Sequence, residues 1–362
     1  MNGPGTRDPF VDWLRATSLV VVVIWHWAFT ILRWTPDGPS PTSPLGFLSG
    51  LWILTWLLQV LPVFFYVGGH VHLISWEHAR ARGERLAGYV WGHVRHLVLP
   101  AIALVVTWTV LGTVLAAAFD LRWIRGAVLL VLSPLWFLGV YVGLLVLLPL
   151  WLWLHRRYDV LVLVWLGGIA LLADVLRFRY GVSWAGWVNL LVVWALAHQA
   201  GFFFQRLADA PRRWTQALLW AGLLGLAGLV FSGLYPGSMV GVPGDRVSNM
   251  GPPTFVIVAL LVFQAGLAEL IRPVLRRWFD RPGPHRFTAA LSRFALPLFL
   301  FHTTGMALAR GFGYLVFDHR LVDDRAPDLI WWVQRPLAIL GPLVCTVPLI
   351  VLFGRNRKKH TV

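Results

Sequence analysis

Long apolar stretches, separated by short polar and arginine-rich segments, recur along the whole chain. Runs such as Leu97–Phe119 and Leu135–Leu154 approach the roughly 20 residues that a helix needs to cross about 30 Å of hydrocarbon. Their apolar residues are continuous rather than alternating, which excludes the strands of a membrane barrel. The pattern predicts an all-α, polytopic bundle of about ten transmembrane helices. The expected spans are 14–33, 48–74, 97–119, 134–154, 160–176, 185–205, 215–235, 253–271, 288–313 and 330–353.

Composition and charge separate this chain from soluble proteins. Of its 362 residues, 58% are hydrophobic and 13% are charged, whereas soluble domains carry roughly 25% charged residues. The 22 Trp residues fit a membrane protein, because indole prefers the headgroup boundary. The net charge of +15 lies in short segments between apolar runs rather than on a water-exposed domain. A lipid bilayer is therefore the predicted partner, and a nucleic acid is not.

The distribution of arginine predicts the topology. Cytoplasmic loops carry an excess of Lys and Arg, and the basic residues are concentrated in connections such as 75–96, 206–213 and 272–286. This asymmetry predicts an even number of spans with both termini in the cytoplasm. The first apolar stretch lacks a small-residue cleavage site and is expected to be a retained span. We expect one transmembrane domain over 1–362, without an appended soluble domain.

The choice of basic residue suggests a source. The chain holds 29 Arg and two Lys, a bias that suggests a GC-rich genome and a bacterium. The expected location is then the inner, cytoplasmic membrane, which the chain would cross several times.

Ionisable residues inside a span are costly and therefore mark functional candidates. His26 lies among Val, Ile and Trp in the first apolar run, and Arg15 lies eleven residues earlier. Eleven residues make about three helical turns, so the two share a face about 16 Å apart along the axis. Arg15 would lie at the cytoplasmic boundary and His26 in mid-membrane, which suits a charged cytoplasmic donor whose reactive end reaches a base. The alternative is structural: His26 as a hydrogen-bond partner, and Arg15 paired with Asp12.

A second candidate region closes the second span. His70 and His72 are followed by an arginine-rich loop that includes Arg82, Arg85 and Arg95. Guanidinium groups suit phosphates, so a coenzyme A phosphate is a natural ligand, although positive-inside charge explains the same residues. Two residues apart on a helix, His70 and His72 point in nearly opposite directions, so we expect at most one of them to share a site with His26.

Other histidines are weaker candidates. His93 and His96 have helical spacing without an evident third ligand, and the single cysteine, Cys345, makes a thiol–metal cluster unexpected. We therefore predict no metal. His198 is interpreted as a hydrogen bond between helices. His302 is another buried imidazole candidate.

Taken in order, these motifs resemble those of the bacterial acyltransferase family 3, membrane proteins that acylate cell-envelope glycans and related acceptors. The resemblance covers essentially the whole chain. It rests on Arg15 and His26 as an Arg-x10-His pattern, Pro62-Val-Phe-Phe, the arginine-rich segment ending in Arg95–Pro100, Leu135-Trp136-Phe-Leu, and Leu298-Phe-Leu-Phe-His302.

The resemblance implies transfer of an acyl group, acetyl first among the options, from cytoplasmic acyl-CoA to a hydroxyl or amine of an envelope glycan, glycolipid or other extracytoplasmic acceptor. It implies His26 as general base or transient acyl carrier, with Arg15 beside it, and no metal. Arg82, Arg85 and Arg95 would hold the phosphates of the donor. His70, His302 and Trp136 would contact the acceptor or orient His26.

The chain also departs from the family pattern. Gly68-Gly69-His70 stands where the family often has Ser-Gly-Phe, and Phe301 stands where it often has Tyr. Arg80, next to Arg82 and Arg85, leaves open which arginines form the pair found in the family. These differences bear on the specificity for acceptor and donor.

Two readings from other classes stay open. A secondary transporter or flippase would use His26 as a proton relay or substrate contact, and it predicts discontinuous spans and a carboxylate in mid-membrane. Asp174 and Glu269, the carboxylates considered for that role, lie near span ends. A non-enzymatic assembly subunit would use the polar residues only to hold helices together. The acyl group, the acceptor and the oligomeric state are not readable from the sequence.

Overall fold

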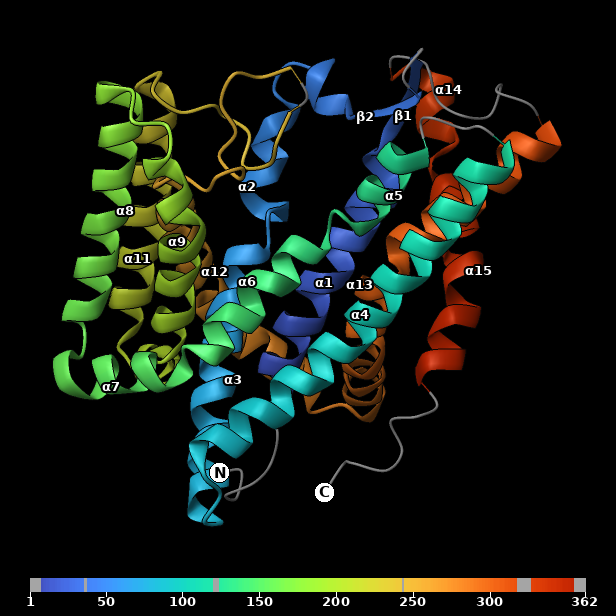
Figure 1. The fold of residues 1–362 in the computed structure, drawn as a ribbon. Helices are drawn as coiled ribbons and strands as arrows, with labels where there is room; N and C mark the ends of the chain where they lie inside the picture. Colours follow the sequence, from blue (N-terminus) through green and yellow to red (C-terminus); the bar gives the residue numbers. More distant parts are fainter. Residues whose placement is uncertain (1–7, 36–37, 120–123, 243, 318–326, 355–362) are drawn as a thin grey trace.

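The structure, a computed structural model, describes residues 8–35, 38–119, 124–242, 244–317 and 327–354, most of which are helical (Figure 1). The first part of the chain forms α1 (Pro9–Phe29), strands β1 (Ile31–Thr35) and β2 (Gly38–Thr42), 3-10 helices η1 (Pro44–Gly46) and η2 (Leu51–Leu54), α2 (Thr55–Leu58), α3 (Leu61–Ala81) and α4 (Leu86–Phe119). The middle forms α5 (Ile124–Leu132), α6 (Leu135–Val146), α7 (Leu148–Tyr158), α8 (Leu161–Tyr180), α9 (Ala185–Gly201), α10 (Phe204–Ala208) and α11 (Arg212–Phe231). The last part forms α12 (Val256–Phe279), α13 (Pro282–Phe317), α14 (Leu329–Val333) and α15 (Arg335–Gly354).

The expected helical, polytopic class is confirmed. Within the described residues, seven helical segments are long and apolar enough to cross a membrane, or eight if the bent pair α5–α6 is one span. Two further expected spans coincide with helices outside that set: α9, of 17 residues, and α13, which carries His302 and two threonines in its middle. The total of ten therefore stays a prediction. So does the placement of the two termini, because residues 1–7 and 355–362 lie outside the described part.

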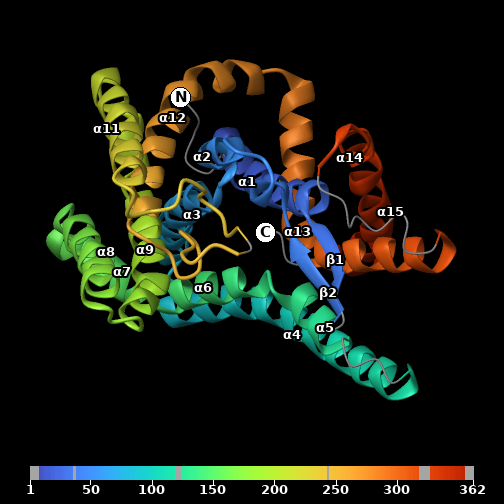
Figure 2. The same cartoon turned by 90° about the horizontal axis from the view of Figure 1, so that it is seen from above.

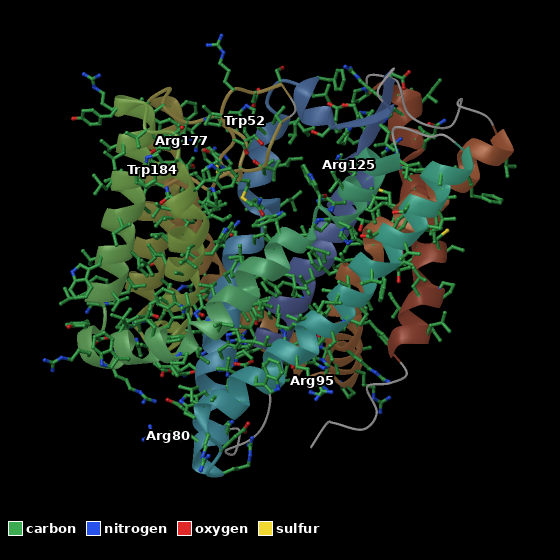
Figure 3. The ribbon with its side chains drawn as sticks, in the orientation of Figure 1. Trp52, Arg80, Arg95, Arg125, Arg177 and Trp184 are labelled. Carbon is green, nitrogen blue, oxygen red and sulfur yellow. The ribbon has the colours of Figure 1, made fainter. Side chains whose placement is uncertain are left out.

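Six labelled residues mark the two ends of the bundle in Figure 3. Arg80 and Arg95 lie towards one end of the bundle, and Arg125, Arg177, Trp52 and Trp184 lie towards the other. We call the end with Arg80 and Arg95 the expected cytoplasmic face and the opposite end the expected outer face.

The first helix occupies the middle of the bundle. Helix α1 contacts α3, α12, α13 and α15, and seen from above it lies inside a ring of the other helices (Figure 2). Asp8 caps its first turn by accepting a hydrogen bond from the backbone N–H of Phe10 at 2.9 Å. A central, capped helix gives a residue such as His26 fixed neighbours on several sides.

Two helices that position polar groups cross at unusually short range. A Cβ on Gly69 of α3 would lie 1.8 Å from the backbone oxygen of His198 on α9, and a Cβ on Gly201 of α9 would lie 1.9 Å from the backbone oxygen of Tyr66 on α3. Only glycine permits this approach, as at other close helix crossings in membranes.

The arginine-rich segment 75–96 was expected to be a loop, and this expectation is wrong for most of it. Helix α3 continues to Ala81 and α4 begins at Leu86, so only residues 82–85 connect them. A helix that leaves the hydrocarbon keeps its internal hydrogen bonds in water, and polar residues therefore do not end it.

Two expected spans are interrupted. The span expected at 48–74 begins as η2 and α2 and restarts as α3 after Gln59 and Val60. The span expected at 134–154 divides into α6 and α7 at Leu147, and α5 meets α6 at an angle of 41°. The apolar piece at 127–132, expected to be re-entrant or interfacial, belongs to α5 of that bent pair. The break at Gln59 and Val60 and the bend between α5 and α6 border the cavity described below.

A long connection lies at the expected outer face (Figure 1). The connection between α11 and α12, described at 232–242 and 244–255, is anchored near both ends by the buried carboxylate of Asp174 on α8, which accepts hydrogen bonds from Tyr235 Oη at 3.0 Å and from the backbone N–H of Phe255 at 2.7 Å. Asn189 Nδ2 on α9 donates to the same carboxylate at 2.9 Å. This fixed connection forms one wall of the cavity.

Candidate functional site

His26 and His302 meet in the interior of the bundle. His26 Nδ1 lies 2.7 Å from His302 Nε2, and the two rings stack with centroids 5.0 Å apart. His302 is fully buried on α13, whereas His26 on α1 is partly accessible. The neighbouring Trp27 donates its indole N–H to the backbone oxygen of His302 at 2.9 Å. The structure therefore brings together two histidines that the sequence offered separately.

The hydrogen bonds indicate which ring nitrogens of His26 and His302 carry a proton. His302 Nδ1 lies against the backbone oxygen of Phe299, which can only accept, so this nitrogen carries the proton. In a neutral imidazole the other nitrogen, His302 Nε2, is then an acceptor, and His26 Nδ1 must donate to it. His26 is left with an unprotonated Nε2. That nitrogen has the lone pair that a base or nucleophile requires.

His26 lines a cavity of about 230 Å³ between the broken spans and the outer connection. Its walls come from α1, the η2–α2–α3 break, the α5–α6 bend, α13 and the 232–255 connection. The lining residues are Val22, Trp25, His26, Thr55, Leu58, Gln59, Leu61, Pro134, Trp136, Phe137, Val240, Gly241, Met250 and Phe299.

The cavity is uncharged and largely apolar, with four Trp or Phe side chains among its lining residues. None of its lining residues, all in the described part of the chain, is Asp, Glu, Lys or Arg. Trp136 is 40% exposed, and Trp25 also lines the space. Gln59 is held by its Nε2, which donates to the backbone oxygen of Met239 at 3.2 Å. The site can therefore hold a neutral group against His26 and surround it with aromatic surface.

Arg15 lies below His26 on the same helix. Its guanidinium is about one-third exposed and contacts Asp12 Oδ1 at 3.1 Å, so the structural pairing considered for these residues is present. Arg15 lies eleven residues before His26 on α1, about three helical turns nearer the start of that helix.

The other predicted arginines lie on the surface. Arg82 ends α3 and contacts Glu84 at 3.9 Å, Arg85 precedes α4, and Arg95 lies on α4. All three are exposed near the expected cytoplasmic face. They are not part of the His26 cavity.

The remaining candidate histidines form other contacts. His72 Nδ1 lies 3.0 Å from His198 Nε2, and His72 Nε2 lies 3.1 Å from Tyr141 Oη. His198 thus bonds one helix to another, as expected. His70 instead stacks on Phe204 with ring centroids 4.4 Å apart. Neither His70 nor His72 lines the cavity with His26.

Sequence reasoning missed several residues of the site. Gln59, Trp25, Phe137 and Phe299 line the cavity, and Tyr141 bonds His72 just beyond it. The amide of Gln59 inside an apolar run was the one available signal. In the sequence, an aromatic residue that lines a cavity looks the same as one that only packs between helices.

Metal ligation was also considered. Over the residues that the structure describes, no three His, Cys, Asp or Glu side chains gather in a way that could hold an ion.

Comparison with known proteins assigns a family. The family model described as an acyltransferase domain, that of acyltransferase family 3, matches residues 8–355. No curated protein and no solved structure matches the chain significantly.

Proposed function

Because the chain belongs to acyltransferase family 3, we propose that it transfers an acyl group, acetyl first among the options, from cytoplasmic acyl-CoA to an acceptor on the other side of a bacterial inner membrane. The acceptor would offer a hydroxyl or an amine on an envelope glycan, a glycolipid or a related molecule. No metal takes part in the proposed reaction.

The observation that carries this proposal is the hydrogen bond between His26 and His302 beside the cavity. It fixes the ring of His26 and leaves Nε2 unprotonated. A fixed neutral imidazole next to an uncharged cavity suits proton abstraction from an alcohol or attack on a thioester.

Two reaction pathways can use His26 Nε2. As a general base, His26 Nε2 takes the acceptor's O–H proton while the oxygen bonds to the thioester carbonyl carbon. The C–S bond then breaks and the proton passes to the CoA sulfur, giving an ester and free CoA thiol. As an acyl carrier, His26 Nε2 bonds to the carbonyl carbon first, the C–S bond breaks, and CoA leaves as a thiolate. The acceptor oxygen then bonds to the carbonyl carbon, the N–C bond to the imidazole breaks, and the hydroxyl proton passes to the thiolate, giving the same ester and free CoA thiol. In both cases His302 accepts the hydrogen bond from His26 Nδ1 and stabilises the positive charge that develops on the ring.

The positions of the arginines support a donor that enters from the cytoplasm. Arg82, Arg85 and Arg95 are exposed, and Arg95 lies towards the same end of the bundle as Arg80 (Figure 3). Arg15 lies on α1, about three turns before His26. A charged nucleotide held at the boundary leaves the uncharged thioester to enter the bundle, which avoids the cost of placing phosphate in hydrocarbon.

The proposal is tested with purified protein in nanodiscs by measuring acetyl-CoA binding and slow hydrolysis. We expect His26→Ala to lose hydrolysis about a hundredfold or more while it still binds acetyl-CoA. Arg85→Ala should weaken binding about tenfold, because a charge-assisted contact to phosphate is lost.

Matched controls are available on the same face. His285→Ala and Arg213→Ala replace exposed residues of the same types away from the cavity, and both should behave as wild type. A panel of longer acyl-CoA thioesters follows if acetyl-CoA fails. If folded wild-type protein binds none of these thioesters, the enzyme proposal is wrong.

Transport is the second candidate, because two broken helical segments border the cavity, as expected for a transporter. The carboxylates considered for coupling already have partners. Asp174 fixes the outer connection, and Glu269 Oε2 lies 3.1 Å from Arg272 Nη1. The acetyl-CoA binding measurement separates the two functions.

A further inference from the structure

A second cavity lies near the expected cytoplasmic face, away from His26. It has a volume of about 370 Å³ and lies between α3, α4 and α7. We call it the Trp153 groove. Trp76 and Leu86 form one side, and Trp153, Arg156 and Arg157 form the other. It combines indole surface with guanidinium groups, a pairing suited to a phosphorylated aromatic molecule.

The arginines of the groove are available to a ligand. Both are exposed, and neither makes an ion pair within the described residues. Asp159, the carboxylate that follows them, contacts Arg206 at 2.9 Å instead. Trp153 is 55% exposed, so its ring face can receive a base. Aromatic stacking and guanidinium contacts are the two interactions that recur where proteins bind nucleotides.

The groove and the His26 cavity lie at different depths along α3. Trp76 in the groove and Leu61 in the cavity are fifteen residues apart on α3, which corresponds to about 22 Å along the axis. Arg82 and Arg85 lie in the short connection next to Leu86, so the predicted phosphate contacts border the same groove.

Polar and aromatic groups continue from the groove into the bundle. Trp76 packs on Tyr89 with ring centroids 5.6 Å apart, and Tyr89 shares a hydrogen bond with Ser75. One turn further, His72 bonds Tyr141 and His198.

Two buried groups along this line lack a partner. Over the described residues, neither His198 Nδ1 nor the side-chain amide of Gln199 makes a hydrogen bond. Both side chains are fully buried. Leaving such groups unpaired is costly.

We propose that the Trp153 groove binds the nucleotide end of the acyl donor, with Arg156 and Arg157 contacting its phosphates and Trp153 stacking on its base. The inference rests on the proposed use of acyl-CoA. It adds a binding site that neither the arginines of the α3–α4 connection nor the His26 cavity supplies.

The test compares donors with and without the nucleotide, in nanodiscs of phosphatidylcholine alone. The variant is Arg156→Gln/Arg157→Gln, and the control is Arg212→Gln/Arg213→Gln, which removes the same charge from exposed positions at the start of α11. We expect the first variant to raise KM for acetyl-CoA about tenfold or more. With acetyl-pantetheine, which lacks the nucleotide, variant, control and wild type should not differ. Trp153→Leu should raise KM for acetyl-CoA in the same selective way.

A binding measurement without turnover separates this inference from the proposed function. Adenosine 3′,5′-bisphosphate should bind wild type and control equally and the groove variant at least tenfold more weakly. If the bisphosphate binds in this way but no thioester is consumed, the groove assignment stands and the acyltransfer proposal fails. If thioesters are consumed and the groove variant has the same KM and the same bisphosphate affinity as the control, the groove assignment is wrong and the acyltransfer proposal stands. A defect that appears only in nanodiscs containing phosphatidylglycerol identifies the ligand as a lipid headgroup, which also overturns it.

Discussion

At the scale of single residues, the orientation of His26 depends on one acceptor atom. His302 Nε2 receives the proton of His26 Nδ1, and His302 is in turn oriented by the backbone oxygen of Phe299. His302 is a positioning residue in this arrangement, because it does not line the cavity. Without it, His26 can turn or adopt the tautomer whose Nε2 carries the proton.

We therefore expect His302→Phe, which keeps a ring but removes the acceptor, to lower kcat for acetyl-CoA hydrolysis about a hundredfold. KM should stay within about twofold of wild type, because the donor does not contact His302. His302→Gln offers an amide oxygen near the position of Nε2 and should recover part of the lost rate.

A merely structural role for His302 predicts a different pattern. Both variants would then lower thermal stability together with activity, and glutamine would rescue neither. Thermal unfolding of the detergent-solubilised variants, measured beside the kinetics, distinguishes the two roles.

The sequence identifies some residues of the site as candidates and gives no signal for others. His26 and His302 stand out because an imidazole inside an apolar run is costly. Their contact joins positions 276 apart, which no spacing rule in a single sequence connects. Gln59 and Tyr141 drew no attention, because a neutral amide or a phenol fits an apolar run at small cost. Ionisable residues were therefore found, and their neutral partners were not.

At the scale of elements, the crossing of α3 and α9 holds the inner polar groups in place. Gly69 and Gly201 face the backbone of the opposite helix at distances that leave no space for a methyl group. The same crossing carries the bond between His72 and His198. Close backbone packing here thus determines which side chains meet.

We expect Gly69→Ala to separate the two helices and to destabilise the protein by about 1–3 kcal/mol, because backbone atoms cannot yield as a flexible side chain can. The measurement is thermal unfolding in detergent, followed by tryptophan fluorescence. Gly168→Ala is the control, since a Cβ there meets nothing within 4 Å. Equal melting temperatures for the two variants would show that the crossing is not tightly packed.

The elements that the sequence misplaced share a physical cause. Apolar content indicates which residues lie in hydrocarbon, but helical hydrogen bonding begins and ends independently of that boundary. The helix α4 therefore starts within the arginine-rich segment, at Leu86. The break at Gln59–Val60 inside an apolar run is equally invisible to hydropathy. A break of this kind is tolerated because it borders a cavity rather than lipid.

At the scale of the whole molecule, the proposed reaction requires that the two faces of the bundle meet different compartments. The Trp153 groove and the exposed arginines at 82, 85 and 95 share the face predicted to be cytoplasmic, whereas Val240, Gly241 and Met250, from the connection between α11 and α12, line the His26 cavity on its other side. Donor and acceptor would then approach the same imidazole from opposite sides. This separation makes transfer across the membrane possible without moving the nucleotide through it.

The topology can be tested with single cysteines in a chain whose one natural cysteine is removed by Cys345→Ser. In intact spheroplasts, we expect Ser183→Cys, beside Trp184, to react with a membrane-impermeant maleimide, and Arg80→Cys to react only after permeabilisation. Activity of the Cys345→Ser parent is the control for folding. The opposite labelling pattern would place the Trp153 groove outside, where acyl-CoA is absent. The donor assignment would then fail even if His26 proved essential, and a substrate taken up from the outer side would become the better explanation of the cavity.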